Sequence, residues 1–388
     1  MFLLVFLNIS CLFLLIHSYF VYPLSIYLLK KITKKNVNSD DIYEPKISIL
    51  IAVYNEELVI EKTLKNFLNS TYDILKMEFI IGSDNSTDKT NEIITNLKKN
   101  IPNLQFYPFS KRRGKSQILN DLIKYATGEI LVFSDANTIY QSDALTKLVR
   151  HFTDSEIGGV SGRLLLLDHE KAAESGNQES KYWEFENWIK ENEGSMGCLI
   201  GANGGIYSIR KYLFVPLPID SPVMDDFYIS LKVLEQKKKF IYDKSAIARE
   251  EIASDIKIEF RRRIRNNAID LSSVKYIKEL LKPEFGIISY GLWSHKIIRW
   301  LSPILLIIIL ITNLFIFNVC LFYSFLLFIQ VLLYLCSYLG YLFTRMGIKF
   351  LPFVLCYYFV FMNLALLLGI FRFLRKTQPA FWQSTKRS

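Results

Sequence analysis

The chain has 388 residues, of which 51% are hydrophobic, and its formal net charge at pH 7 is +10. The hydrophobic fraction and a mean hydropathy of +0.21 argue against a wholly soluble protein and predict segments that lie in lipid. Basic residues gather beside apolar stretches and in short clusters, which favours a membrane surface and a phosphorylated substrate over nucleic acid. Of five cysteines, four lie in apolar stretches and Cys198 stands alone. This pattern is typical of a reducing compartment and predicts neither disulfides nor a zinc site.

The N-terminal segment predicts a membrane anchor. Residues 1–29 contain no Asp, Glu, Lys or Arg, which is enough for one transmembrane helix. A basic linker, residues 30–45, follows and contains four lysines near its start. Basic residues on this side hold the next segment in the cytoplasm, so we predict an uncleaved anchor with its N-terminus outside the cell.

Strands and helices alternate after the linker. Apolar runs predict strands at Lys46–Val53, Met77–Gly82, Leu104–Phe109 and Glu129–Phe133. Helical periodicity predicts helices at Glu57–Asn69, Thr90–Leu97, Ser116–Ala126 and Ala144–His151. This order indicates an α/β domain, 46–282, with a mostly parallel sheet and helices on both faces. Ligands of such sheets bind beyond the carboxyl ends of the strands.

The next part of the chain is less regular. Ser180–Glu193 predicts an amphipathic helix that lies at a membrane surface, beside a substrate groove, or packed on the domain by its aromatic side chains. Further elements are predicted as extended segments at Ile206–Ile209, Phe240–Tyr242 and Ala246–Ala248, and as helices at Phe227–Glu235 and Ile256–Leu281.

The C-terminal part predicts further membrane helices. After an interfacial connection, 283–300, the segments 301–344 and 350–371 contain no charged residue, so we expect about three helices within 301–371. The tail, 372–388, is basic. Four spans with an outside N-terminus would place this tail outside, against the usual charge bias. Either one apolar stretch is re-entrant or interfacial, or the tail is an exception.

Polar side chains follow the ends of the predicted strands. Acidic and amide groups occur at Asn55-Glu56, Asp84, Asp135 with Asn137, and Asp225-Asp226, and basic clusters at 111–115, Arg163 and 261–265. Carboxylates bind divalent cations, whereas guanidinium and ammonium groups bind phosphates. The mixture therefore favours a nucleoside diphosphate bound through a cation.

These motifs, in this order, resemble those of the membrane-bound family 2 glycosyltransferases with a GT-A fold, which include cellulose, hyaluronan and poly-N-acetylglucosamine synthases. The resemblance covers about residues 46–270. Its matching segments are Ile49–Glu56, Gly82–Asp88, Arg113–Lys115 with Asn120, Ser134–Asn137, Gly204–Arg210, Asp225-Asp226 and Arg262-x-x-Arg265. It implies a multi-pass protein of the cell membrane whose catalytic domain is cytoplasmic.

The resemblance also implies a donor site. Asp84 would contact the nucleobase or ribose, and Lys115 would lie near the nucleotide. Asp135 would contact the ribose or diphosphate and, together with Asn137, would hold Mg²⁺ or Mn²⁺. The implied donor is a nucleoside-diphosphate sugar, most simply a UDP-sugar.

For the chemistry, the resemblance implies that Asp226 is the catalytic base and that Arg265 helps to hold the diphosphate. An inverting transfer needs a carboxylate to remove the proton of the acceptor hydroxyl while cations stabilise the leaving diphosphate. We also assign to substrate binding the neighbouring residues Asn55, Glu56, Asn203, Gly204, Asp225 and Arg262.

Two departures from the family pattern affect the details. Asn137 stands where the metal motif has a second Asp, and it can offer only an uncharged carbonyl oxygen to a metal. The processive synthases have Gln-x-x-Arg-Trp where this chain has Arg262-Arg263-Ile264-Arg265-Asn266. The aromatic platform for the acceptor sugar is therefore missing.

The predicted activity is an inverting, metal-dependent transfer of a hexose or N-acetylhexosamine to a growing polysaccharide or glycan at the membrane. An alternative is the transfer of a single sugar to a lipid carrier or glycolipid. A third hypothesis, a non-catalytic nucleotide-binding membrane protein, is disfavoured because such a protein needs no base at Asp226.

Overall fold

The structure is a computed structural model that describes residues 1–388 except 34–38, 168–175, 252–255, 349 and 379–388. Its described residues divide into two compact units. The sheet unit comprises the described residues of Ile26–Ser254 and Ser272–Ser289, and the helical unit comprises those of Met1–Ser25, Asp255–Leu271 and Tyr290–Gln378.

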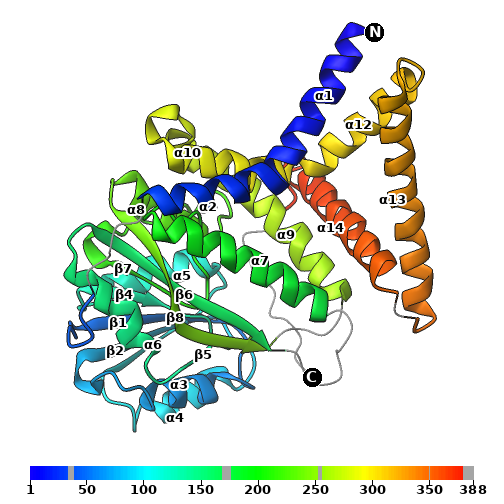
Figure 1. The fold of residues 1–388 in the computed structure, drawn as a ribbon. Helices are drawn as coiled ribbons and strands as arrows, with labels where there is room; N and C mark the ends of the chain where they lie inside the picture. The colour runs from blue at the N-terminus through cyan, green and yellow to red at the C-terminus, as the bar shows by residue number, and fades with distance from the viewer. Residues whose placement is uncertain (34–38, 168–175, 252–255, 349, 379–388) are drawn as a thin grey trace. The chain divides into compact units, whose positions relative to one another are not determined.

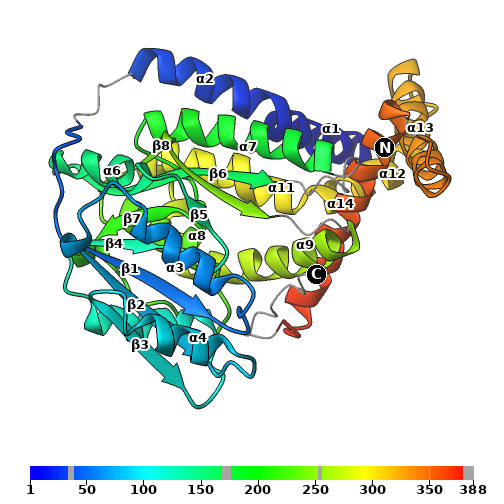
Figure 2. The same cartoon turned by 90° about the horizontal axis from the view of Figure 1, so that it is seen from below.

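The sheet unit is built on one eight-stranded sheet (Figures 1 and 2). Its strands are β1 (Ile47–Val53), β2 (Met77–Asp84), β3 (Leu104–Phe109), β4 (Ile130–Phe133), β5 (Ile139–Tyr140), β6 (Ile157–Leu167), β7 (Tyr207–Arg210) and β8 (Lys239–Glu251). The spatial order is β3-β2-β1-β4-β7-β6-β8-β5. Strands β3, β2, β1 and β4 are parallel, β7 pairs antiparallel with both β4 and β6, and β6 is parallel to β8. The predicted α/β class and mostly parallel sheet are confirmed.

Helices cover both faces of this sheet. The sheet unit contains α3 (Ile60–Leu68), α4 (Thr90–Leu97), α5 (Lys115–Leu122), α6 (Ala144–Val149), α7 (Gly176–Ser195) and α8 (Asp225–Glu235). Ile49 and Ile51 of β1 face the main core with Leu64 of α3. On the other face, the backbone of Gly82 in β2 packs against Ile118 of α5 so closely that a Cβ would lie 2.5 Å from that side chain. Successive side chains of a strand point to opposite faces of the sheet, so both faces of β1 and β2 are buried, each against a layer of helices.

Three features of the sheet unit differ from the predicted elements. The extended segments around Phe240 and Ala248 form a single strand, β8. The eleven-residue strand β6 was not predicted, because it begins at Ile157-Gly158-Gly159, and glycine is a weak strand former. Its glycines are needed here, since a Cβ at Gly159 would lie 2.2 Å from the ring of Phe240. The two-residue strand β5 was also not predicted.

The helical unit contains the long apolar helices. Its elements are α1 (Phe2–Ile16), α9 (Ile256–Ser273), α11 (Ile298–Trp300), α12 (Ser302–Ile316), α13 (Leu321–Arg345) and α14 (Leu351–Leu374), while α2 (Tyr22–Thr33) and α10 (Ile287–Gly291) straddle the boundary between the units. The predicted helix 256–281 ends at Ser273 and continues as short 3₁₀ turns. Within this unit, Asn8 of α1 donates hydrogen bonds to Thr312 and Asn313 of α12.

By length and composition, three helices among the described residues could cross a membrane: Phe2–Thr33, Leu321–Arg345 and Leu351–Leu374. A fourth candidate is the pair Ile287–Trp300 and Ser302–Ile316, which is bent by 63°. The predicted N-terminal span thus corresponds to one helix, and the C-terminal apolar block corresponds to two long helices and half of a bent pair.

Candidate active site

The site lies where the end of β4 meets the beginning of β7. These strands are antiparallel, and Phe133, the last residue of β4, pairs with Tyr207, the first residue of β7. The segment that follows β4, Ser134–Asn137, therefore lies beside the turn 201–205 that precedes β7. Sequence reasoning identified both segments, and the antiparallel pairing explains why they meet.

An ion-pair network joins three elements at this point. Lys115 is the first residue of α5, and its Nζ lies 2.8 Å from Asp135 Oδ1 and 3.0 Å from Asp225 Oδ2. Burial opposes the charge of the lysine, but the two carboxylates raise the pKa of Lys115 above its usual range. Burial raises the pKa of Asp225, with the charge of Asp135 adding to the effect and Lys115 opposing it. The structure thus brings together three predicted site residues.

Asp226 is the second residue of α8, where the N-terminal end of a helix favours a negative charge. Its Oδ1 accepts a hydrogen bond of 2.8 Å from the backbone N–H of Phe227. Burial and the neighbouring charge of Asp225 raise the pKa of Asp226 to about 6, against the effects of Lys115 and Lys190. A carboxylate with such a pKa is well suited to accept a proton near neutral pH.

The turn before β7 passes close to two of these carboxylates. A Cβ at Gly204 would lie 3.1 Å from Asp226 Oδ2 and 3.8 Å from Asp135 Oδ2. Asn203, within this turn, is fixed to β6 by two hydrogen bonds. Its backbone N–H donates to Ser161 Oγ, and its Nδ2 donates to the carbonyl of Gly162. Gly204 therefore leaves space between Asp135 and Asp226.

Asp84, at the end of β2, is buried and organises the loop after β3. Its two carboxylate oxygens accept hydrogen bonds from the backbone N–H groups of Arg113 (2.6 Å) and Gly114 (2.9 Å). The same loop places the guanidinium of Arg112 over the ring of Tyr54, 3.6 Å from its centroid. The predicted donor-binding carboxylate thus shapes the backbone of the basic loop, and Tyr54 was not identified from the sequence.

Asn55 and Glu56 follow β1 and contact the loop after β2. Asn55 has a positive φ of 53°, and its side chain accepts a hydrogen bond from the backbone N–H of Thr87. The N–H of Glu56 donates to Thr90 Oγ1, and Asp88 accepts from the N–H groups of Glu57 and Thr90. These contacts join two loops at the carboxyl edge of the sheet.

Asp135 and Asn137, the predicted metal ligands, both contact other side chains of the protein. Asn137 Nδ2 donates a hydrogen bond of 2.8 Å to Glu250 Oε1 on β8, and Asp135 is paired with Lys115. Among the described residues, no group of three or more His, Cys, Asp or Glu side chains is arranged to hold a metal ion. The residues fit an ion of the Mg²⁺ type, which binds one or two carboxylates and completes its shell with substrate phosphates and water.

Arg262 and Arg265 lie on α9, in the helical unit. Arg262 Nε donates to Glu259 Oε2 at 2.6 Å, and Arg265 contacts Asn266 Oδ1 at 3.3 Å. The roles of Arg262 in substrate binding and of Arg265 in diphosphate binding remain predictions, as do those of the other site residues.

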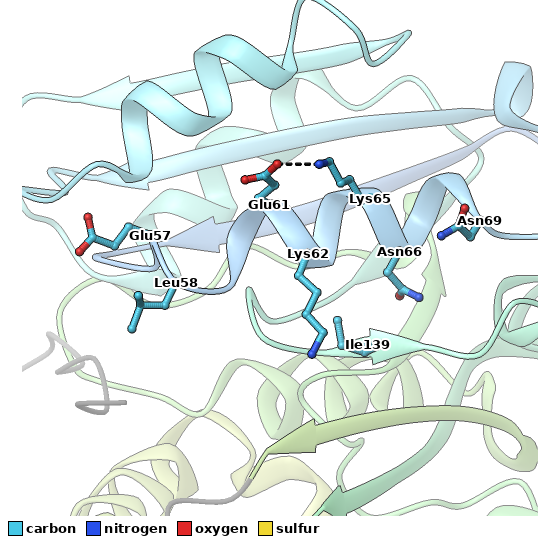
Figure 3. Close-up of a pocket in the computed structure, with 8 residues that line it drawn as sticks. All are labelled: Glu57, Leu58, Glu61, Lys62, Lys65, Asn66, Asn69 and Ile139. Carbon is cyan, nitrogen blue, oxygen red and sulfur yellow. Dashed lines mark hydrogen bonds and ion pairs between the residues drawn. The ribbon is translucent and has the colours of Figure 1, made fainter. Parts of the chain in front are cut away.

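A shallow pocket of about 550 Å³ lies along α3. Figure 3 shows its lining, in which Glu61 pairs with Lys65, and Lys62 reaches toward Ile139. Its other lining residues are Glu57, Leu58, Asn66 and Asn69, so it contains none of the predicted site residues.

The fold is similar to that of a solved glycosyltransferase structure. A mannosyltransferase from Pyrobaculum calidifontis, solved with GDP-Man and Mn²⁺, superposes with a TM-score of 0.71 at 21% identity, covering 95% of this chain and 99% of that one. The fold is that of a GT-A glycosyltransferase. Residues 48–213 match the model of glycosyl transferase family 2.

Two curated relatives are similar to part of this chain. A poly-beta-1,6-N-acetyl-D-glucosamine synthase from Staphylococcus aureus is 27% identical over 269 residues, which cover 69% of this chain and 56% of that protein. A beta-monoglucosyldiacylglycerol synthase from Nostoc is 31% identical over 169 residues, which cover 43% of this chain and 36% of that protein. The match to this chain thus spans little more than half the length of the first relative.

Proposed function

We propose that this protein transfers a sugar, with inversion, from a nucleoside-diphosphate sugar to a glycan or lipid-linked acceptor at the membrane. The observation that carries the proposal is the ion-pair network of Lys115, Asp135 and Asp225, in which Asp135 faces Asp226 across Gly204. This arrangement supplies a carboxylate whose pKa is near 6 beside a second carboxylate and an ammonium group. Such a set suits the removal of a proton from an acceptor hydroxyl next to a diphosphate.

In this mechanism Asp226 accepts the proton of the acceptor hydroxyl as the oxygen attacks the anomeric carbon, and the bond to the diphosphate breaks. Asp225 and Lys115 fix the electrostatic surroundings of that base. Asp84 shapes the loop that would receive the nucleoside, and Arg262 and Arg265 would contact the diphosphate. Asp135, with the carbonyl oxygen of Asn137, would hold Mg²⁺ or Mn²⁺, and the bound ion would neutralise charge on the diphosphate.

Two acceptor classes follow from the relatives. The Staphylococcus relative is named as the synthase of a polysaccharide, and the Nostoc relative as the synthase of a glycolipid. Asn266 follows Arg265 where the processive synthases have Trp. This difference favours the transfer of one or a few sugars to a lipid-linked acceptor over processive synthesis.

The apolar helices support a location in the membrane, with the sheet unit in the cytoplasm. With Phe2–Thr33, α13 and α14 as spans and the bent pair 287–316 as a re-entrant segment, the basic tail lies in the cytoplasm, as the charge bias requires. A reporter fused after Ser388 tests this topology: activity of a periplasmic or extracellular reporter there would refute it.

The experiment that tests the proposed function is a donor screen on membranes that contain the full chain. UDP-GlcNAc, UDP-Glc and GDP-Man are supplied with Mg²⁺, with Mn²⁺, or with EDTA. We expect ion-dependent release of the nucleoside diphosphate with at least one donor, and transfer of the sugar to the lipid fraction. The length of the product distinguishes the acceptor classes, and the absence of transfer with every donor would contradict the proposal.

A further inference from the structure

Lys190 is a buried lysine on α7, a helix that lies along β8 (Figures 1 and 2). It is 6% exposed, and its Nζ donates a hydrogen bond of 2.6 Å to Asn203 Oδ1 and one of 3.4 Å to the carbonyl of Ala202. A buried ammonium is costly unless its hydrogen bonds are satisfied. Both acceptors belong to the turn that precedes β7.

The turn is held from two places on α7. Glu193, three residues after Lys190, accepts a hydrogen bond of 3.0 Å at Oε2 from the backbone N–H of Ile200. Lys190 holds the other end through Asn203, whose own side chain also binds the carbonyl of Gly162. The pair of contacts fixes the path of the backbone from Ile200 to Asn203.

The fixed turn continues directly into Gly204. The backbone of Gly204 lies so close to Asp226 that a Cβ there would be 3.1 Å from Asp226 Oδ2. A chain of contacts therefore runs from Lys190 through Asn203 and Gly204 to the carboxylate of Asp226. A shift of the turn would change the space beside that carboxylate.

Lys190 also contributes charge. The groups that face Asp226 come from several elements: Asp225 from α8, Lys115 from α5 and Lys190 from α7. Asp135, at the end of β4, faces it across Gly204, and Tyr207 of β7 lies near the same carboxylates. Lys115 is already paired with Asp135 and Asp225, so Lys190 supplies a second positive charge from a different helix.

We propose that Lys190 is a positioning residue of the transfer reaction, which holds the Asn203–Gly204 turn beside Asp226 and supplies a positive charge to that carboxylate. The inference rests on the proposed function, in which Asp226 is the base. It assigns to α7 a role in the chemistry, where the sequence left open a helix at a membrane surface, a helix beside a substrate groove or a helix packed on the domain.

The experiment compares Lys190→Met, Lys190→Gln and Lys190→Arg in the full chain in membranes, with Lys244→Met as a matched control. Lys244 is also paired with α7, through Glu191, but its side chain is 64% exposed. We expect Lys190→Met to lower kcat about 30-fold while the KM for the donor changes less than about threefold. We also expect the acid limb of kcat/KM to move to higher pH, because the loss of a positive charge raises the pKa of Asp226.

The other variants separate charge from packing. Lys190→Arg keeps the charge, so its acid limb stays in place and part of the rate is retained. Lys190→Gln keeps a hydrogen-bond donor but loses the charge, so its acid limb of kcat/KM moves while its kcat falls less than that of Lys190→Met. If thermal melting shows that Lys190→Met does not fold, Lys190→Gln replaces it as the uncharged variant. Lys244→Met behaves as the wild type.

Either of two results would overturn the inference: a wild-type kcat in Lys190→Met, or an unmoved acid limb in both uncharged variants. Asp226→Asn is measured in parallel. If Asp226→Asn retains transfer, the proposed function fails. If Asp226→Asn is inactive while Lys190→Met is normal, the inference about Lys190 alone fails.

Discussion

The ammonium of Lys115 lies 2.8 Å from a carboxylate oxygen of Asp135, although the two residues are 20 positions apart in the chain. The contact joins the first turn of α5 to the end of β4, so a helix on one face of the sheet is tied to the carboxyl edge where ligands bind. Because Lys115 also contacts Asp225 at the start of α8, one side chain organises the site.

Replacement of Lys115 is expected to abolish most activity. Lys115→Met leaves two carboxylates close together without their shared cation, and one of them, Asp225, is largely buried, so its unpaired charge is costly. We expect transfer to fall at least about 100-fold, with weaker binding of the donor, and Lys115→Arg to retain a measurable part. Initial rates at varied donor concentration test this, with the exposed Lys124→Met as control. A Lys115→Met enzyme with normal kcat/KM would refute the organising role of this residue.

Gly204→Ala tests the space beside Asp226. The added methyl group would lie 3.1 Å from Asp226 Oδ2, closer than an ordinary contact, so the carboxylate or the turn must move by a few tenths of an ångström. A small misplacement at a reacting group is expensive, and we expect kcat to fall about tenfold. The melting temperature should change little, which distinguishes a local effect from unfolding. An unchanged kcat would show that this spacing does not matter for catalysis.

The pH dependence of the reaction follows from the base. Asp226 has a pKa raised to about 6 by burial and by Asp225, and it accepts a proton only in its ionised form. We therefore expect kcat/KM to fall as the pH is lowered through about 6, and to be level above it. Rates at fixed concentrations of donor and metal ion, between about pH 4.5 and 8, provide the test. A limb at the ordinary pKa of an aspartate, about 4, would contradict the assignment.

A second cluster of titratable side chains surrounds Asp243. The carboxylate of Asp243 contacts His151 Nε2 at 2.7 Å and Arg150 Nη2 at 2.8 Å. Burial alone would raise the pKa of Asp243, but hydrogen bonds from His151 and Ser245 hold it well below its usual range. A lowered folded-state pKa gives stability that is present above the unfolded pKa of about 4 and is lost as the pH falls through the folded value.

Asp243→Asn is therefore expected to destabilise the protein by about 3 kcal/mol at pH 7, because it leaves Arg150 without its buried partner. The difference from the wild type should shrink as the pH falls below about 4. Thermal melting of the detergent-solubilised full chain at several pH values measures both effects. Equal melting temperatures at pH 7 would show that the cluster does not contribute to stability.

Much of the sheet was predictable because its parallel half obeys simple rules. β1, β2 and β4 are largely apolar strands that are buried along their whole length, and each is followed by a polar loop. The start and end of α4 and β3 were predicted to the residue. The antiparallel half was less accessible, because β6 begins with glycines whose role depends on Phe240, about 80 residues away in the chain.

The candidate site likewise contains residues that the sequence predicted and one that it did not. Asp135, Asp225 and Lys115 were found because polar groups at strand and helix ends stand out, and the structure brings them within ion-pair distance. Lys190 could not be found, because a lysine in a glutamate-rich helix has the pattern of a solvated surface. Its burial depends on where Asn203 lies, and that is a property of the folded chain.

The most direct test of the central claim compares donor binding and sugar transfer in the wild type and in Asp226→Asn. The amide keeps the size of the side chain but cannot accept the proton. We predict that Asp226→Asn binds the donor with an affinity within about threefold of the wild type while transfer falls at least about 100-fold. Near-normal transfer by Asp226→Asn would contradict the assignment of Asp226 as the base of a glycosyltransferase.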